Sequence, residues 1–260
     1  MYATNYIKNY QVVIDHMLKC YPNEGCGIVT KSDMFIPMDN IAEDASQSFR
    51  MDPSVLEVYD VKAIIHSHVY DPNDTEKLRE MVDPRIPSLA DMAGQIETNV
   101  EWGICITEGE NVTEPIWFGD YDHRPPLMDR EFIHSIQDCL EFMKDWQYKQ
   151  YGLKLPSQPR NFDWFEVNEK QPKPFNYFED CYEKWGFVDV SEQPQAKGDV
   201  VFYKIKADVV NHIGVIVEPE LVAHHLFGRF PVVEPLAIWR KYITKRIRHK
   251  TNSAYSPGEK

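Results

Sequence analysis

Two histidines and two carboxylates in the first half of the chain have types and spacing suited to holding a metal ion and activating water. His66 and His68 are separated by one residue at the end of the apolar run VKAIIHSHVY. Alternate side chains of a strand point to the same face, so both imidazoles can bind one ion. Asp91, in PSLADMAGQ, could be the third ligand of a tetrahedral site whose fourth position holds water. Glu24, in YPNEGCGIV, could take the proton from that water.

The metal that best suits this set is zinc, because two imidazoles and one carboxylate surround an open position. A histidine pair alone is weak evidence, since many such pairs are only the polar end of a strand. Cys26 could border the ion, because it lies two residues from Glu24. The simpler interpretation of Cys26 is a small buried residue that packs a tight turn.

The second half of the chain contains a candidate thiol nucleophile. Cys139 follows Asp138 at a position where a helix could begin. Unpaired amides at a helix N-terminus lower the pKa of a thiol and favour the reactive thiolate. The alternative is one continuous helix over 129–151, in which Cys139 only packs in the core.

Two histidines further along could activate that thiol. The segment NHIGVIVEPELVAHHLFGR predicts a hairpin with its turn centred near Glu218 and Pro219. If His212 and His224 are equidistant from that centre, they lie directly across from each other, with Cβ atoms about 5 Å apart, and His225 faces the opposite side. His212 could then abstract the thiol proton while His224 fixes its tautomer. Paired strand histidines are also common as satisfied polar residues.

The elements that must position these residues are short helices and strands. Apolar spacing predicts helices over 6–18 and 129–151, and a helix over 88–99 that is capped by Ser88 after Pro87. A Pro-rich loop is predicted over 155–174. Buried strands are predicted at 27–30, 61–65, 102–106, 200–203, 212–217 and 221–227.

Length and composition predict two globular domains with α+β folds. The chain has 260 residues, of which 43% are hydrophobic and 13% aromatic, enough for two ordinary cores. The polar segment FGDYDHRPP, at 118–126, lacks periodicity and is the expected boundary. We therefore place one domain at 1–119 and a second at 125–250, and we expect 251–260 to be a disordered tail.

Charge and cysteine content exclude several functions. The net charge of -13 disfavours binding to nucleic acid or anionic lipid. The N-terminus lacks the pattern of a secretion signal, and no window approaches the roughly 20 apolar residues of a membrane span, so we expect folding in a cytoplasm. The five cysteines show no paired CxxC spacing, which predicts reduced thiols.

The order of the first set of motifs resembles the JAMM metallopeptidases, which carry a glutamate, then HSH or HTH, then SxxD. The resemblance covers residues 6–118 and implies an α/β/α domain with one zinc ion. The implied zinc ligands are His66, His68 and Asp91. Glu24 would be the general base, and Ser88 would assist the oxyanion.

Two departures from the JAMM pattern concern the mouth of this site. Val69 stands where many members of the family have proline. The segment 69–87 is longer than the usual interval between HSH and the serine, and it is rich in charge. This insert could be a lid, a substrate selector or an assembly contact.

The second set of motifs resembles the NlpC-type papain-like peptidases, which have a DC at a helix start, a GDxVxF strand and a histidine strand. The matching segments are Asp138-Cys139, KGDVVFY at 197–203 and HIGVIV from His212, with His224 at the orienting position. The resemblance covers about residues 127–248 and implies a papain-like α+β fold. Cys139, His212 and His224 would then be catalytic. The glycine and tyrosine that often precede the DC are not clear in REFIHSIQDC.

A JAMM domain followed by an NlpC-type domain is similar to the tail tip assembly protein K family of long, flexible-tailed phages, and so is the segment HHLFGR at 224–229. The resemblance implies hydrolysis of amide or isopeptide bonds in peptidoglycan stem peptides or in a protein. It also implies other tail tip proteins as partners, and a place in the host cytoplasm during assembly or at the virion tail tip. Two alternatives are a structural tail module with vestigial sites and a cellular isopeptidase for ubiquitin-like modifiers, which only the first domain suggests.

Overall fold

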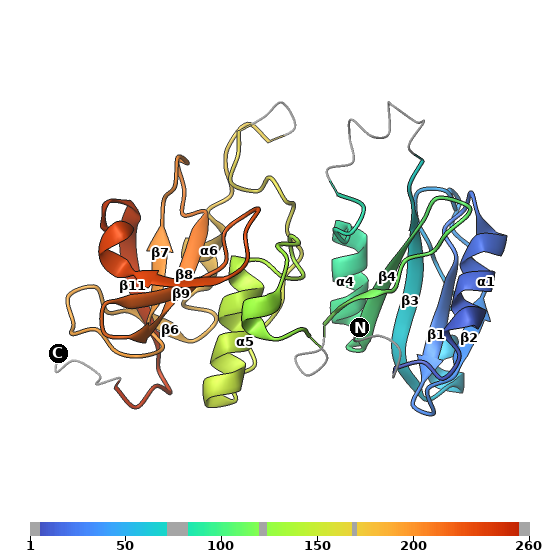
Figure 1. Cartoon of the computed structure of the whole chain (residues 1–260), viewed down its shortest axis with the longest axis horizontal. Helices are drawn as coiled ribbons and strands as arrows, with labels where there is room; N and C mark the ends of the chain where they lie inside the picture. Colours follow the sequence, from blue (N-terminus) through green and yellow to red (C-terminus); the bar gives the residue numbers. More distant parts are fainter. Residues whose placement is uncertain (1–5, 72–82, 120–123, 168–170, 255–260) are drawn as a thin grey trace. The chain divides into compact units, whose positions relative to one another are not determined.

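The structure is a computed structural model that describes residues 6–71, 83–119, 124–167 and 171–254 (Figure 1). The chain divides into two compact units, Met1–Arg124 and Pro125–Lys260. The division falls inside the polar segment 118–126. Each unit has a sheet of its own. No described helix is long and apolar enough to cross a membrane.

In its described residues, the first unit is a five-stranded sheet with helices on both faces, in the order β2-β1-β3-β4-β5. Only β3 and β4 pair in parallel, and α4 makes the crossover between them. α1 and α4 lie on opposite sides of the sheet (Figure 1). The elements are α1 (Tyr10–Cys20), β1 (Cys26–Thr30), β2 (Phe35–Met38), α2 (Val55–Val58), β3 (Val61–Val69), α4 (Leu89–Thr98), β4 (Glu101–Thr107) and β5 (Ile116–Phe118).

The core of the first unit explains these layers. Val13 and Met17 of α1 pack with Ile65 on one face of the sheet. On the other face, the ring of Trp102 lies against Gly94 of α4, where any Cβ would come within 2.6 Å of it. Residues 63–67 of β3 are buried, and Ala63, Ile64 and Ile65 form the uninterrupted apolar run expected of a strand that is covered on both faces.

In the described part of the second unit, an antiparallel six-stranded sheet has the order β10-β9-β8-β7-β11-β6. The face that carries Ile213 and Val215 packs against α5, whose Leu140 and Met143 belong to the same core. The elements are η1 (Leu127–Asp129), α5 (Cys139–Tyr151), α6 (Tyr177–Cys181), β6 (Phe187–Asp189), β7 (Val200–Tyr203), β8 (His212–Glu218), β9 (Leu221–His224), β10 (Val232–Pro235), η2 (Leu236–Ile238), η3 (Arg240–Tyr242) and β11 (Ile243–His249).

Four predicted elements have bounds that are wrong by three residues or more. The strand predicted over 61–65 continues to Val69. The first helix begins at Tyr10 instead of residue 6, because Tyr6 and Ile7 are buried without being helical. The predicted helix over 129–151 begins only at Cys139, after Ser135 adopts a positive φ of 64°. The strand predicted over 221–227 ends at His224. The two helix bounds were wrong because apolar spacing indicated burial and not a helical backbone.

The predicted loop and tail are held by specific contacts. The described residues of 155–174 contain no helix or strand, as predicted, and Arg160 donates to Asp138 at 2.5 Å. The prediction of a disordered tail is wrong for 251–254, because Arg248 donates to the carbonyl of Ala254 at 2.7 Å. Residues 255–260, and 72–82 within the insert, lie outside the described residues.

A buried ion pair stabilises the start of the second unit. Arg130 Nη1 lies 2.5 Å from Asp145 Oδ2 of α5, and both side chains are fully buried. Arg130 Nε also donates to the carbonyl of Pro125 at 2.9 Å. The pair therefore ties the chain that enters this unit to its central helix.

Removing one partner of this pair should destabilise the protein strongly. Asp145→Ala leaves the charge of Arg130 buried, and we expect the free energy of unfolding to fall by about 3–5 kcal/mol in urea titrations followed by tryptophan fluorescence. The matched control is Asp60→Ala, which removes an ion pair with Lys31 whose side chains are 66% and 71% exposed and should change little. Equal losses in the two variants would contradict the expectation.

Candidate functional site

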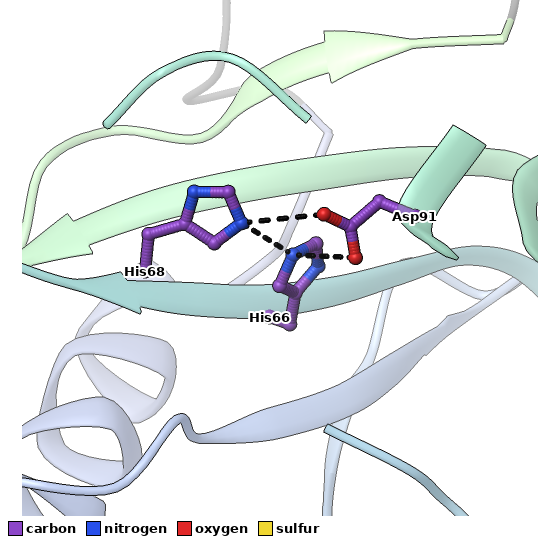
Figure 2. A group of neighbouring side chains, drawn as sticks. All are labelled: His66, His68 and Asp91. Carbon is purple, nitrogen blue, oxygen red and sulfur yellow. Dashed lines mark hydrogen bonds and ion pairs between the residues drawn. The ribbon is translucent and has the colours of Figure 1, made fainter. Parts of the chain in front are cut away.

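Three of the predicted metal ligands converge in the first unit. His66 and His68 lie on β3, and Asp91 lies in the first turn of α4 (Figure 2). The two Nε2 atoms are 3.1 Å apart, and each lies 3.4 Å from an oxygen of Asp91. Ligand atoms about 2.0–2.1 Å from a tetrahedral zinc are about 3.3 Å from one another. The spacing of these three side chains therefore fits a zinc ion.

The surroundings of the histidines fix their orientation. His68 Nδ1 lies 2.7 Å from the carbonyl of Pro84, which can only accept, so the ring hydrogen of neutral His68 is on Nδ1. Its Nε2 lone pair then points toward His66 and Asp91. The ring of Phe49 stacks on His66 with centroids 4.4 Å apart. Pro84, near the end of the insert, thus accepts from the far ring nitrogen of a predicted ligand.

Asp91 is held by the start of its own helix. The amide of Ser88 donates to Asp91 Oδ2 at 2.7 Å, and Ser88 Oγ accepts from the amide of Asp91 at 3.1 Å. This reciprocal capping uses Ser88 Oγ as an acceptor and leaves its O–H available to donate. Burial opposes the charged carboxylate, but His66 and His68 hold the pKa of Asp91 well below its usual range.

Glu24 is buried at the turn before β1. Ser67, which points away from the two flanking histidines, anchors this turn: its Oγ accepts from the amide of Gly25, and its amide donates to the carbonyl of Gly25, both at 2.9 Å. Burial lowers the pKa of His68, but Asp91 and then Glu24 outweigh it and raise that pKa. Glu24 is therefore one of the charged groups that act electrostatically on His68.

Cys26 is a packing residue in the structure. It pairs with His66 across the sheet, and its thiol contacts the carbonyl of Met38 at 3.7 Å. Burial raises the pKa of Cys26 to about 12, with smaller contributions from nearby acidic groups. A neutral thiol directed at a carbonyl agrees with the simpler interpretation of this residue.

The second site begins with the N-terminus of α5. Asp138 Oδ1 accepts from the amides of Leu140 and Glu141 at 3.0 and 3.1 Å, so Cys139 is the first helical residue. The alternative of one continuous helix over 129–151 is therefore wrong. Asp138 Oδ2 accepts from the amide of Ser135 at 2.7 Å and from Arg160.

The thiol of Cys139 is neutral in the resting protein. Burial raises the pKa of Cys139 to about 12, and Asp138 adds to the effect; Arg160 and then the amides of Ile213 and Leu140 act in the opposite direction. The predicted lowering of this pKa is thus wrong, because burial outweighs the helix N-terminus. The contact with Ile213 places the thiol beside β8, next to His212 in the chain.

His212 and His224 form a hydrogen-bonded pair. His212 Nε2 lies 2.9 Å from His224 Nδ1, and both side chains are buried. The predicted direct opposition is wrong, because a register shift between Ile216 and Glu218 places Gly214 opposite His224. The histidines meet diagonally across this glycine, where an added Cβ would lie 3.1 Å from His224 Cβ.

The environment of the pair keeps His212 neutral at rest. Burial lowers the pKa of His212 well below the usual range, and His224 contributes in the same direction. The ring of Tyr203 stacks on His212 at 5.5 Å. His225 turns to the face that α5 covers, where its ring meets Phe142.

Three residues that the sequence analysis missed extend this pair. His224 Nε2 lies 3.2 Å from Glu234 Oε2, which also accepts from Trp239 Nε1 at 2.8 Å. Arg229 donates to Glu234 Oε1 at 2.8 Å. The signal that could have found Glu234 is the alternation of VVEP on β10, which pairs with β9 through Val232 and His224.

Comparison with known proteins identifies the second unit. Residues 129–249 match the NlpC/P60 family. The matched range contains Cys139, His212 and His224. The chain is also 27% identical over 253 residues to tail tip assembly protein K of Escherichia phage N15, a likeness that covers 94% of this chain and 95% of that protein. The chain is thus a homologue of a tail tip assembly protein, with an NlpC/P60 domain.

The raised pKa of Cys139 predicts an unusual alkylation profile. Only the thiolate reacts, so the rate of Cys139 modification by iodoacetamide should keep rising between about pH 7 and pH 10. Mass spectrometry of the Cys139 peptide measures this rate, and the same peptide in denaturant provides the profile of an ordinary thiol. A plateau that begins below about pH 6 would instead reveal a preformed thiolate and imidazolium pair.

Proposed function

We propose that this chain is a phage tail tip assembly protein whose second unit is a cysteine peptidase for peptidoglycan stem peptides. The observation that carries the proposal is a helix-start thiol, Cys139, beside the strand of a buried His212–His224 pair within an NlpC/P60 domain. The likeness to a phage tail protein over 94% of the chain favours this role over a cellular isopeptidase. Other tail tip proteins are its proposed partners, in the host cytoplasm or at the virion tail tip.

The proposed reaction starts from a neutral thiol and a neutral imidazole. His212 accepts the proton of Cys139 as the sulfur attacks the amide carbonyl of the substrate. The C–N bond then breaks, the amine leaves with the proton held by His212, and a thioester remains on Cys139. Water activated by His212 hydrolyses the thioester and restores the thiol. His224 orients His212 throughout.

We further propose that the first unit is a zinc metallopeptidase of the JAMM type. The ligand spacing, the tautomer of His68 and the buried Glu24 support this proposal. A zinc ion held by His66, His68 and Asp91 would supply a Lewis acid that acidifies water. Glu24 would accept the proton of that water, and the free O–H of Ser88 would donate to the oxyanion. The proposed substrate is a protein component of the tail.

Replacing the thiol tests the first proposal. Cys139→Ala should lower the rate of muropeptide hydrolysis by a factor on the order of 10³–10⁶, measured by chromatography of soluble muropeptides. Cys20→Ala, which removes a half-buried thiol of the first unit, should leave the rate unchanged. Undiminished hydrolysis by Cys139→Ala would show that another group is the nucleophile.

Metal analysis tests the second proposal. The parent protein should contain about one zinc ion per chain, and His66→Ala/His68→Ala should contain none, because one carboxylate cannot retain the ion. Glu24→Gln should keep the zinc and lose processing of tail protein, since only the base is removed. Circular dichroism controls for folding. A folded parent without zinc, or processing by Glu24→Gln at the parent rate, would contradict this assignment.

A further inference from the structure

Glu234 terminates the hydrogen-bonded series that begins at His212. It lies on β10, at the edge of the six-stranded sheet, whereas His224 is on β9 and His212 on β8. The three side chains thus come from three neighbouring strands. His212 Nε2 lies 2.9 Å from His224 Nδ1, and His224 Nε2 lies 3.2 Å from Glu234 Oε2.

We propose that Glu234 is a positioning residue of the thiol site, which sets the tautomer of His224 and, through it, directs the lone pair of His212 to Nδ1. This inference rests on the proposed peptidase function of Cys139, but the tautomers themselves do not depend on any substrate. Glu234 touches neither substrate nor sulfur in this role. It acts only through the two histidines.

The tautomers follow from the donors and acceptors that are present. An ionised carboxylate can only accept, so the hydrogen of neutral His224 must be on Nε2, the nitrogen that faces Glu234. His224 Nδ1 then carries a lone pair and accepts from His212 Nε2. A neutral imidazole has one N–H, so His212 Nδ1 is left with the lone pair that can receive a proton.

Glu234 is kept ionised by the donors around it. Its Oε1 accepts from Arg229, and its Oε2 accepts from Trp239. Burial alone would raise the pKa of Glu234, but Arg229, Trp239 and His224 together lower it. The carboxylate thus stays an obligate acceptor at neutral pH.

Aromatic rings cover the two buried histidines of the series, whereas the side chain of Glu234 is 24% exposed. The ring of Trp239 packs edge-on against His224 with centroids 4.9 Å apart, and Tyr203 stacks on His212. The hydrogen bond between these two buried histidines is therefore stronger and more directional than it would be in water. When His212 becomes an imidazolium during the reaction, its charge is shared through His224 with Glu234.

Without Glu234, His224 can carry its hydrogen on Nδ1. Two N–H groups would then face each other unless His212 also changed tautomer and turned its own N–H toward Cys139. In either arrangement, some of the protein molecules lack the correctly placed lone pair on His212 Nδ1 that would accept the proton. A role of Glu234 in stability alone, through its bond to the exposed Arg229, would not change the tautomers.

The experiment compares Glu234→Leu with Glu234→Gln in the full chain. Leucine offers no acceptor, whereas the amide oxygen of glutamine can still accept from His224 while its NH₂ turns toward the more exposed Arg229. Nitrogen-15 spectra of histidine-labelled protein near pH 7, assigned by single His→Gln variants, report which ring nitrogen is protonated. Glu218→Gln is the control, because Glu218 is an exposed carboxylate at the far end of β8.

The parent and Glu234→Gln should show unprotonated Nδ1 atoms on both histidines, and Glu234→Leu should show mixed tautomers. Glu234→Leu should also lower kcat for Cys139-dependent hydrolysis by about 10- to 100-fold with KM nearly constant, the usual effect of losing an outer partner of a histidine. Glu234→Gln should recover most of that loss. Unchanged tautomers in Glu234→Leu would overturn this inference, whereas correct tautomers in a parent that hydrolyses nothing would overturn only the peptidase assignment.

Discussion

Both candidate sites depend on a carboxylate that fixes the first turn of a helix. The first amides of a helix have no partner within it, and an acid that accepts from them is itself held in one orientation. Asp91 exchanges two bonds with Ser88 at the start of α4. Asp138 accepts from two amides at the start of α5. The first carboxylate presents itself to the histidines, and the second fixes the neighbouring Cys139 beside the sheet.

Burial then decides the protonation states around each capped helix. Burial alone would raise the pKa of Asp138, but Arg160, His134 and the amide of Ser135 hold it well below the usual range, so this buried carboxylate stays ionised. Arg160 also lowers the pKa of Cys139, but burial and the charge of Asp138 outweigh it, so Cys139 stays a thiol. Its pKa is far above that of buried His212, so proton transfer is unfavourable before attack. The transfer becomes favourable only as negative charge leaves the sulfur for the carbonyl oxygen.

The sequence predicted the elements whose patterns are strong and local. The HSH motif lies on a strand that is buried on both faces, and the SLAD motif is a capping box, so the helix over 88–99 could be placed from its cap. The sequence could not show whether α5 begins at residue 129 or at residue 139, because the apolar spacing typical of a helix continues through Ile133 and Ile136. These residues are buried without being helical.

Contacts between segments that are far apart in the chain could not be predicted from the sequence. Glu234 was missed because β10 is a short edge strand whose partner is decided by the whole sheet. Pro84 was missed because a backbone carbonyl leaves no mark in a sequence. The diagonal meeting of His212 and His224 depends on a register shift that equal spacing from a turn cannot reveal. The candidate site residues could thus be predicted from the sequence, but the groups that hydrogen-bond to them could be identified only from the fold.

Pro84 and Glu234 each fix the tautomer of a histidine, one through a neutral carbonyl and the other through a carboxylate. At the metal ligands, the carbonyl of Pro84 holds the hydrogen of His68 on the far nitrogen. At the thiol site, Glu234 does this for His224. A neutral carbonyl suits a ligand that must remain unprotonated, because it adds no full charge that would favour the imidazolium. A carboxylate suits the thiol site, because its charge acts through His224 to stabilise the imidazolium that forms at the base His212 in every turnover. The acceptor at each site, the carbonyl of Pro84 or the carboxylate of Glu234, therefore matches the chemistry proposed for that site.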